Sequence, residues 1–145
     1  MEGDVSFSQF AEWADEILEK VPEVLLRELH GGIQLSREAR REPTDPPGVY
    51  HLGEYIVDPY LGHMIILYYG SFRKIFRDEP PEVWRDELEN TIWHELRHHV
   101  ETLAGVDDLV EEDVMELFRL RAEAERGAEE EEGEEEDEQE RSTTP

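Results

Sequence analysis

Apolar residues recur at helical spacing across the segment 80–104. They lie three and four residues apart, at Trp84, Leu88, Ile92, Leu96, Val100 and Leu103. This stripe predicts a long amphipathic helix that turns one face toward a core. Pro80 and Pro81 favour its first turn, and Gly105 predicts its end after Ala104.

Four shorter segments are also predicted to be helical, from apolar spacing and from residues that commonly cap helices. They are residues 6–19 with Ser6 as N-cap, 24–29, 71–76 with Ser71 as N-cap, and a last helix from Asp107 or Asp108 to about residue 126. Pro22 separates the first two, and Gly31-Gly32 ends the second.

Three segments rich in branched and aromatic residues predict strands. They cover residues 33–35, 49–56 and 63–69, and the last of these is the strongest candidate. Residues 36–48 are polar, basic and proline-containing, which predicts a loop. The mixture indicates an α+β fold, with a short sheet of about three strands packed on the long helix.

The long predicted helix contains the motif His94-Glu95-Leu96-Arg97-His98. Two histidines four residues apart lie on one helix face, where two imidazoles can bind one zinc ion. Glu95 lies beside that site, where a carboxylate can act on a metal-bound water. The apolar stripe falls on the opposite side of the helix from His94 and His98. His99 falls on the apolar side, so we expect it to be partly buried and to donate to a backbone carbonyl.

Composition limits the classes of partner. The 145 residues carry a formal charge of -25 and no cysteine, so neither disulfides nor cysteine–zinc sites are available. Such a charge repels phosphate backbones, which argues against nucleic-acid binding, and no apolar run is long enough to span a membrane. We expect a cytoplasmic protein. The acidic surface favours basic partners or peptides.

The C-terminal segment has a different composition from the rest of the chain. Residues 129–140 contain ten acids, and residues 127–145 as a whole contribute about -9 of the charge. A segment of this composition cannot bury a core, so it is predicted to be a disordered acidic tail. Residues 1–126 are then the single folded domain, and a basic partner is one expected use of the tail.

The chain resembles a small bacterial family of metallopeptidase-like proteins with a minimal zincin fold. The likeness depends on the motif at 94–99, on Leu103-Ala104-Gly105 with Asp107-Asp108, and on the segments 52–55 and 65–70. It covers roughly residues 7 to 120. The resemblance implies a short sheet beside the motif helix, a strand along the edge of a cleft, and a metal-dependent peptidase-like site.

The third metal ligand is left open by the sequence. Many members of that family have a glycine three residues after the second histidine and an aspartate three further on, where this chain has Glu101 and Ala104. Glu101 lies on the same helix face as His94 and can lean back toward it, so we expect it to be the ligand. Alternatives are Asp108, which follows Gly105, and three acids of the last predicted helix: Glu112, Asp113 and Glu116.

These observations predict a zinc-dependent metallopeptidase with one zinc ion on His94, His98 and Glu101, and with Glu95 as general base. An edge strand, expected to be the one ending at Tyr69, would hold an extended peptide or protein substrate. Tyrosine hydroxyls are candidates for stabilising the oxyanion; they are Tyr55, Tyr68 and Tyr69. Two alternatives remain, a non-catalytic metal-binding or regulatory protein and an acidic protein-interaction module.

Overall fold

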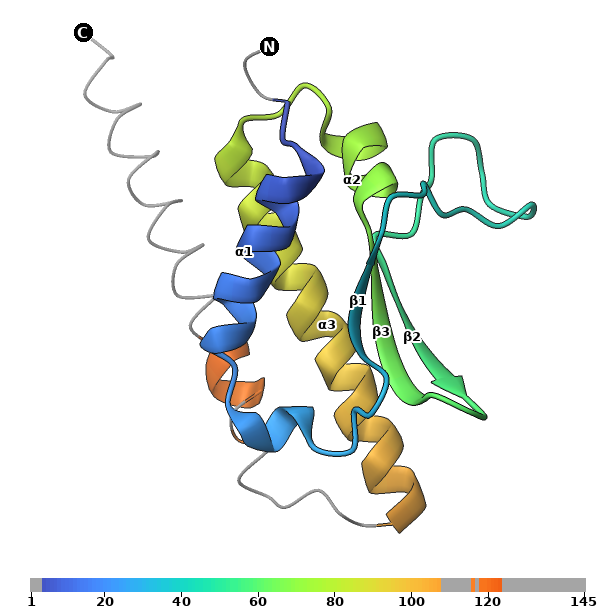
Figure 1. The fold of residues 1–145 in the computed structure, drawn as a ribbon, viewed down its shortest axis with the longest axis vertical. Helices are drawn as coiled ribbons and strands as arrows, with labels where there is room; N and C mark the ends of the chain where they lie inside the picture. The colour runs from blue at the N-terminus through green and yellow to red at the C-terminus, as the bar shows by residue number, and fades with distance from the viewer. Residues whose placement is uncertain (1–3, 108–115, 117, 124–145) are drawn as a thin grey trace, which may run out of the picture. The chain divides into compact units, whose positions relative to one another are not determined.

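A three-stranded sheet lies against the long helix that carries the histidine motif (Figure 1). The computed structural model describes residues 4–107, 116 and 118–123. The elements of the first unit, Met1–Asp107, are α1 (Phe7–Glu19), the 3-10 helix η1 (Glu23–Leu26), β1 (Gly32–Ser36), β2 (Gly53–Asp58), β3 (Gly62–Tyr68), α2 (Tyr69–Phe76) and α3 (Pro81–Asp107). In the second unit, Asp108–Pro145, residues 116 and 118–123 are helical.

The sheet has the order β1-β3-β2, so β3 is its central strand. β1 runs parallel to β3 and β2 antiparallel, which makes the sheet mixed. The predicted α+β class with about three strands is therefore confirmed. The expectation that the strand ending at Tyr69 forms an edge is wrong, because β3 has hydrogen-bonded neighbours on both sides and Tyr69 already begins α2.

Helix α3 lies between α1 and the sheet (Figure 1). Its predicted apolar stripe is buried throughout, with every stripe side chain from Trp84 to Leu103 at most 8% exposed. The Trp84 indole N–H donates to the carbonyl of Phe76, 2.7 Å away, so the largest core side chain also satisfies its polar atom. This burial fixes which side of α3 faces the core, and hence which side carries the histidines.

Several element boundaries differ from the predictions. Ser6 caps α1 as expected, since its Oγ accepts from the Gln9 N–H at 3.1 Å. Ser71 does not cap α2 but lies inside it, where its Oγ accepts from the backbone N–H of Arg40 at 2.8 Å. α3 continues through Gly105 to Asp107, because glycine weakens a helix without breaking it. β2 begins only at Gly53, four residues after the predicted start of that strand.

Candidate functional site

His94, Glu95 and His98 come together on α3 because of their helical spacing. Each offers one possible ligand atom, and these three atoms lie within 4.8 Å of one another. The two Nε2 atoms of the histidines are 3.1 Å apart, with the ring planes nearly perpendicular at 89°. No other group of three such side chains is this close among residues 4–107, 116 and 118–123. Both histidines are exposed, so they can accept a ligand from solvent.

Glu95 differs from the two histidines because its side chain is buried, with 8% exposure against 67% for His94. Its Oε1 lies 4.0 Å from Nε2 of His94. Burial raises the pKa of this carboxyl above its ordinary value, while His98 and His94 lower it and the Glu54 charge raises it. A desolvated carboxylate beside two exposed imidazoles is a candidate general base.

Gly53, the first residue of β2, lets the strand approach this carboxylate closely. A Cβ at Gly53 would lie 2.8 Å from Cγ2 of Thr91 and 3.3 Å from Cγ of Glu95. Any larger residue would therefore push against α3. The glycine thus lets β2 pack closely beside Glu95, while both histidines stay exposed.

An open cleft of about 780 Å³ runs along this junction. One wall comes from α3, through Asn90, Thr91, His94, Glu95, His98 and Thr102. The other comes from the start of β2 and the residues before it, Tyr50 to Tyr55. The volume falls in the range of ligand-binding clefts.

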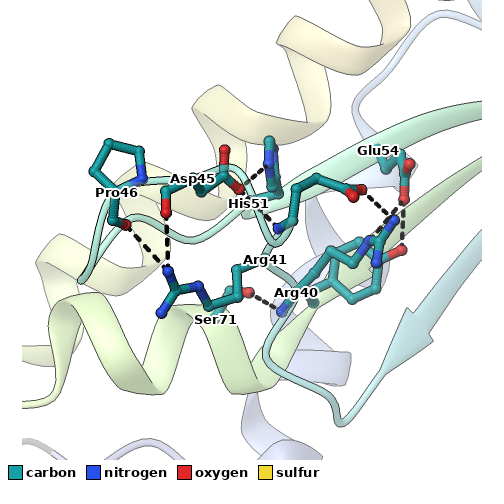
Figure 2. Close-up of polar contacts among 9 residues, drawn as sticks. Arg40, Arg41, Asp45, Pro46, His51, Glu54 and Ser71 are labelled. Atoms are coloured by element: carbon teal, nitrogen blue, oxygen red, sulfur yellow. Dashed lines mark hydrogen bonds and ion pairs between the residues drawn. The ribbon is translucent and has the colours of Figure 1, made fainter.

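The wall before β2 is held by a network of polar contacts in the loop 37–52 (Figure 2). The Arg40 carbonyl accepts from the His51 N–H at 2.8 Å, and Asp45 Oδ2 lies 2.9 Å from His51 Nε2. The Arg40 guanidinium lies 3.7 Å from Glu54 Oε2, which also accepts from the Tyr68 hydroxyl at 2.7 Å. The segment predicted to be a loop is therefore anchored to both β2 and β3.

Among solved structures, the chain is similar to that of a conserved hypothetical protein from Thermus thermophilus. The two are 38% identical, with a TM-score of 0.62, over 70% of this chain and 100% of that one. The chain belongs to the same family as this protein. No family model matches the chain, and no curated protein does. The relationship supports the fold.

The predicted third ligand is not among the three clustered side chains. Glu101 is exposed, and its Oε1 accepts from the Arg97 side chain at 3.0 Å, an ion pair between residues four apart on the helix. Glu116 is paired with Arg119 in the second unit. Asp108, Glu112 and Asp113 lie outside the described residues. The structure thus brings two histidines and Glu95 together, and the third ligand remains a prediction.

The three candidate tyrosines have different surroundings. Only Tyr55 lines the cleft, and its hydroxyl bonds to the Nδ1 atoms of His99, at 2.7 Å, and of His63. The Tyr68 hydroxyl donates to Glu54, and the Tyr69 hydroxyl donates to the carbonyl of Val5 at 2.5 Å. The expectation for His99 is confirmed, because it is fully buried and its Nε2 donates to the carbonyl of Arg27 at 2.7 Å.

Sequence reasoning missed several cleft residues: Tyr50, His51, Asn90, Thr91 and Thr102. Three of them had a detectable signal, since Asn90 precedes His94 by four residues and Thr102 follows His98 by four, while Thr91 precedes Glu95 by four. The sequence carries no such signal for Tyr50 and His51, because only the folding of the loop brings them to the cleft.

The described helices include none that is both long enough and apolar enough to cross a membrane.

Proposed function

We propose that this protein is a zinc-dependent hydrolase, most specifically a metallopeptidase of the minimal zincin type. The observation that carries the proposal is the pairing of His94 and His98, with Nε2 atoms 3.1 Å apart, beside the buried carboxylate of Glu95. The cleft of about 780 Å³ gives a substrate access to all three.

The two imidazoles fit a divalent cation. Two nitrogens at about 2.0 Å from one tetrahedral zinc would be about 3.3 Å apart, close to the observed separation. Both side chains are exposed, and within the described part of the chain neither Nε2 atom forms a hydrogen bond to a carbonyl or carboxylate. A bound zinc ion would polarise a substrate carbonyl and lower the pKa of its water.

Glu95 would remove the proton from the attacking water and pass it to the leaving amine. Its position supports this role, because its carboxylate lies beside the histidines but is shielded from bulk solvent. Desolvation raises its pKa toward the working range of a general base, and the adjacent imidazoles keep it from rising further.

β2 offers a place for an extended peptide. It pairs with β3 along one edge, and its residues Gly53, Glu54 and Tyr55 line the cleft. A peptide that added to its other edge would form main-chain hydrogen bonds, which do not depend on sequence. A peptide bound in this way would run along the cleft wall that faces His94, Glu95 and His98.

A non-catalytic metal-binding protein is the second candidate. The Glu101 carboxylate is paired with Arg97 rather than with the histidines, so the described residues supply two imidazoles and no separate third ligand. A catalytic zinc site usually has three protein ligands and an open position. Zinc uptake without turnover would fit this second function.

The test is zinc binding and peptide hydrolysis on full-length protein purified without a metal affinity column. Wild type and Glu95→Gln should each bind one zinc ion, and hydrolysis of a peptide library should fall at least about 100-fold in Glu95→Gln. His94→Ala should lose zinc binding and keep its helical circular dichroism. His30→Ala is the matched control, since His30 is exposed and paired with Glu28 outside the cleft.

Two results would contradict the proposal. Failure of the wild type to bind zinc at micromolar concentration would remove the metal site, and equal hydrolysis by wild type and Glu95→Gln would remove the mechanism. Zinc binding with no turnover on any peptide would leave the non-catalytic function. Glu101→Ala and Asp108→Ala, measured for zinc affinity alone, identify which of these acids is the third ligand.

A further inference from the structure

A second hollow, outside the cleft, is lined by four basic side chains. Its volume is about 540 Å³, and its lining includes Arg37, Arg73, Lys74 and Arg77 but no acidic residue. The range 4–107 contains ten lysines and arginines, so four of ten gather around one hollow. This concentration is unexpected in a chain with a net charge of -25.

The fold builds this cluster from two separate segments. Arg73, Lys74 and Arg77 lie on the last turn of α2 or directly after it, and Arg37 comes from the loop that follows β1. Gly70 allows the segments to meet, because a Cβ there would lie 2.5 Å from the backbone N of Ala39. The guanidinium of Arg37 is placed by packing, 4.1 Å above the ring of Phe7.

The positive charge of the hollow is poorly compensated. Arg73 has one distant partner, Asp4, at 3.9 Å. Within the part of the chain that the structure describes, no carboxylate forms an ion pair with Arg37, Lys74 or Arg77. Arg73 and Arg77 are four apart on consecutive turns, where like charges repel. A bound anion would relieve this repulsion.

We propose that this hollow binds the phosphate group of a small soluble solute. Three guanidinium groups suit phosphate, since each can donate two parallel hydrogen bonds to its oxygens, and the lysine adds a point charge. The binding of a small anion depends on the charges nearest to it, because charges farther away than about 8 Å are largely screened at physiological salt. A nucleic acid or an anionic membrane would instead meet the whole acidic surface and be repelled. The inference does not depend on the proposed hydrolase activity.

The test is a titration of the full-length protein with inorganic pyrophosphate in about 0.15 M sodium chloride, near physiological ionic strength, followed by amide chemical shifts in nuclear magnetic resonance. Saturable shifts should concentrate at residues 37–39 and 69–77. The variant Arg73→Gln/Lys74→Gln should bind at least tenfold more weakly. The variant Lys20→Gln/Arg27→Gln removes the same charge from exposed residues outside the hollow and should stay within twofold of the wild type.

Three outcomes would overturn the proposal. The first is the absence of saturable binding at millimolar pyrophosphate. The second is an equal loss of pyrophosphate affinity in the two double variants, which would show that binding depends only on the net charge of the protein. The third is tighter binding, through the same residues, to vesicles containing phosphatidic acid or to single-stranded RNA, which would replace the small solute by a macromolecular anion.

Discussion

A chain of hydrogen bonds runs from the backbone carbonyl of Arg27 through His99 and Tyr55 to His63. The carbonyl at its end determines which atoms carry the protons. Because the Arg27 carbonyl can only accept, His99 Nε2 carries a proton, and its Nδ1 is free to accept from Tyr55. The Tyr55 hydroxyl has one proton, so the His63 Nδ1 must donate to it. Burial lowers the pKa of His99 and so keeps it in the neutral form that this chain requires.

We predict that Tyr55→Phe lowers the free energy of unfolding by about 1–3 kcal/mol, because it leaves the Nδ1 atom of buried His99 without its donor. Urea unfolding at pH 7 measures this change. Tyr60→Phe is the control, since Tyr60 is 94% exposed. Equal stability of the two variants would show that the hydroxyl contributes nothing.

The Tyr55 hydroxyl should also make the folded protein less stable at alkaline pH. Burial raises the pKa of Tyr55 to about 12, above its ordinary value of 10.0. A raised pKa means that the folded state favours the neutral phenol, so this contribution is full below pH 10 and is lost as the pH rises toward 12. Tyr55→Phe should therefore lose less stability over this range than the wild type. Some loss should remain, because burial also raises the pKa of Tyr68 to about 12.

At the level of elements, the contact between β2 and α3 forms the site. α3 supplies both histidines and the carboxylate, and β2 packs beside that buried carboxylate while the histidines stay exposed. Gly53 sets the distance between the two elements, because Thr91 and Glu95 leave no room for a Cβ. The loop contacts of Figure 2 hold the start of β2 in this position.

Gly53→Ala is predicted to destabilise the fold by about 1–3 kcal/mol through overpacking. It should also displace Glu95 and reduce any zinc-dependent hydrolysis. Gly48→Ala is the matched control, because Gly48 has a φ of +83° with no atom within 4 Å of the added Cβ. That variant should lose about 1–2 kcal/mol from backbone strain alone and keep its specific activity. Similar activity losses in both variants would contradict a role for the β2–α3 distance.

Across the whole molecule, the described core, the cleft and the three clustered side chains all belong to the unit Met1–Asp107. Most of the net negative charge lies outside the C-terminal segment. Removal of residues 127–145, which carry a charge of -9, would change the net charge of the chain from -25 to -16. The proposed zinc site and the C-terminal acidic segment are therefore expected to act independently.

Truncation after residue 126 should leave zinc stoichiometry and hydrolysis unchanged. The physical reason is that no predicted ligand lies beyond Glu116. Zinc titration of the truncated and full-length proteins measures this, and association with a basic peptide should weaken and become less salt-dependent on truncation. Loss of zinc binding on truncation would show that the C-terminal segment supplies a ligand.

The sequence alone determined the features that depend on neighbours three or four residues away. They include the buried stripe of α3, the Ser6 cap, and the placement of His94 and His98 on one face, because helical geometry follows from local backbone hydrogen bonds. The burial of His99 followed from the same periodicity.

Only the tertiary structure decided which strand is central, which backbone N–H donates to Ser71, and that Gly53 lies close to Glu95. It also decided that Arg37 joins the basic residues of α2 around one hollow. These contacts join segments tens of residues apart in the chain. Their formation depends on loop closure and packing, for which residue spacing carries no signal.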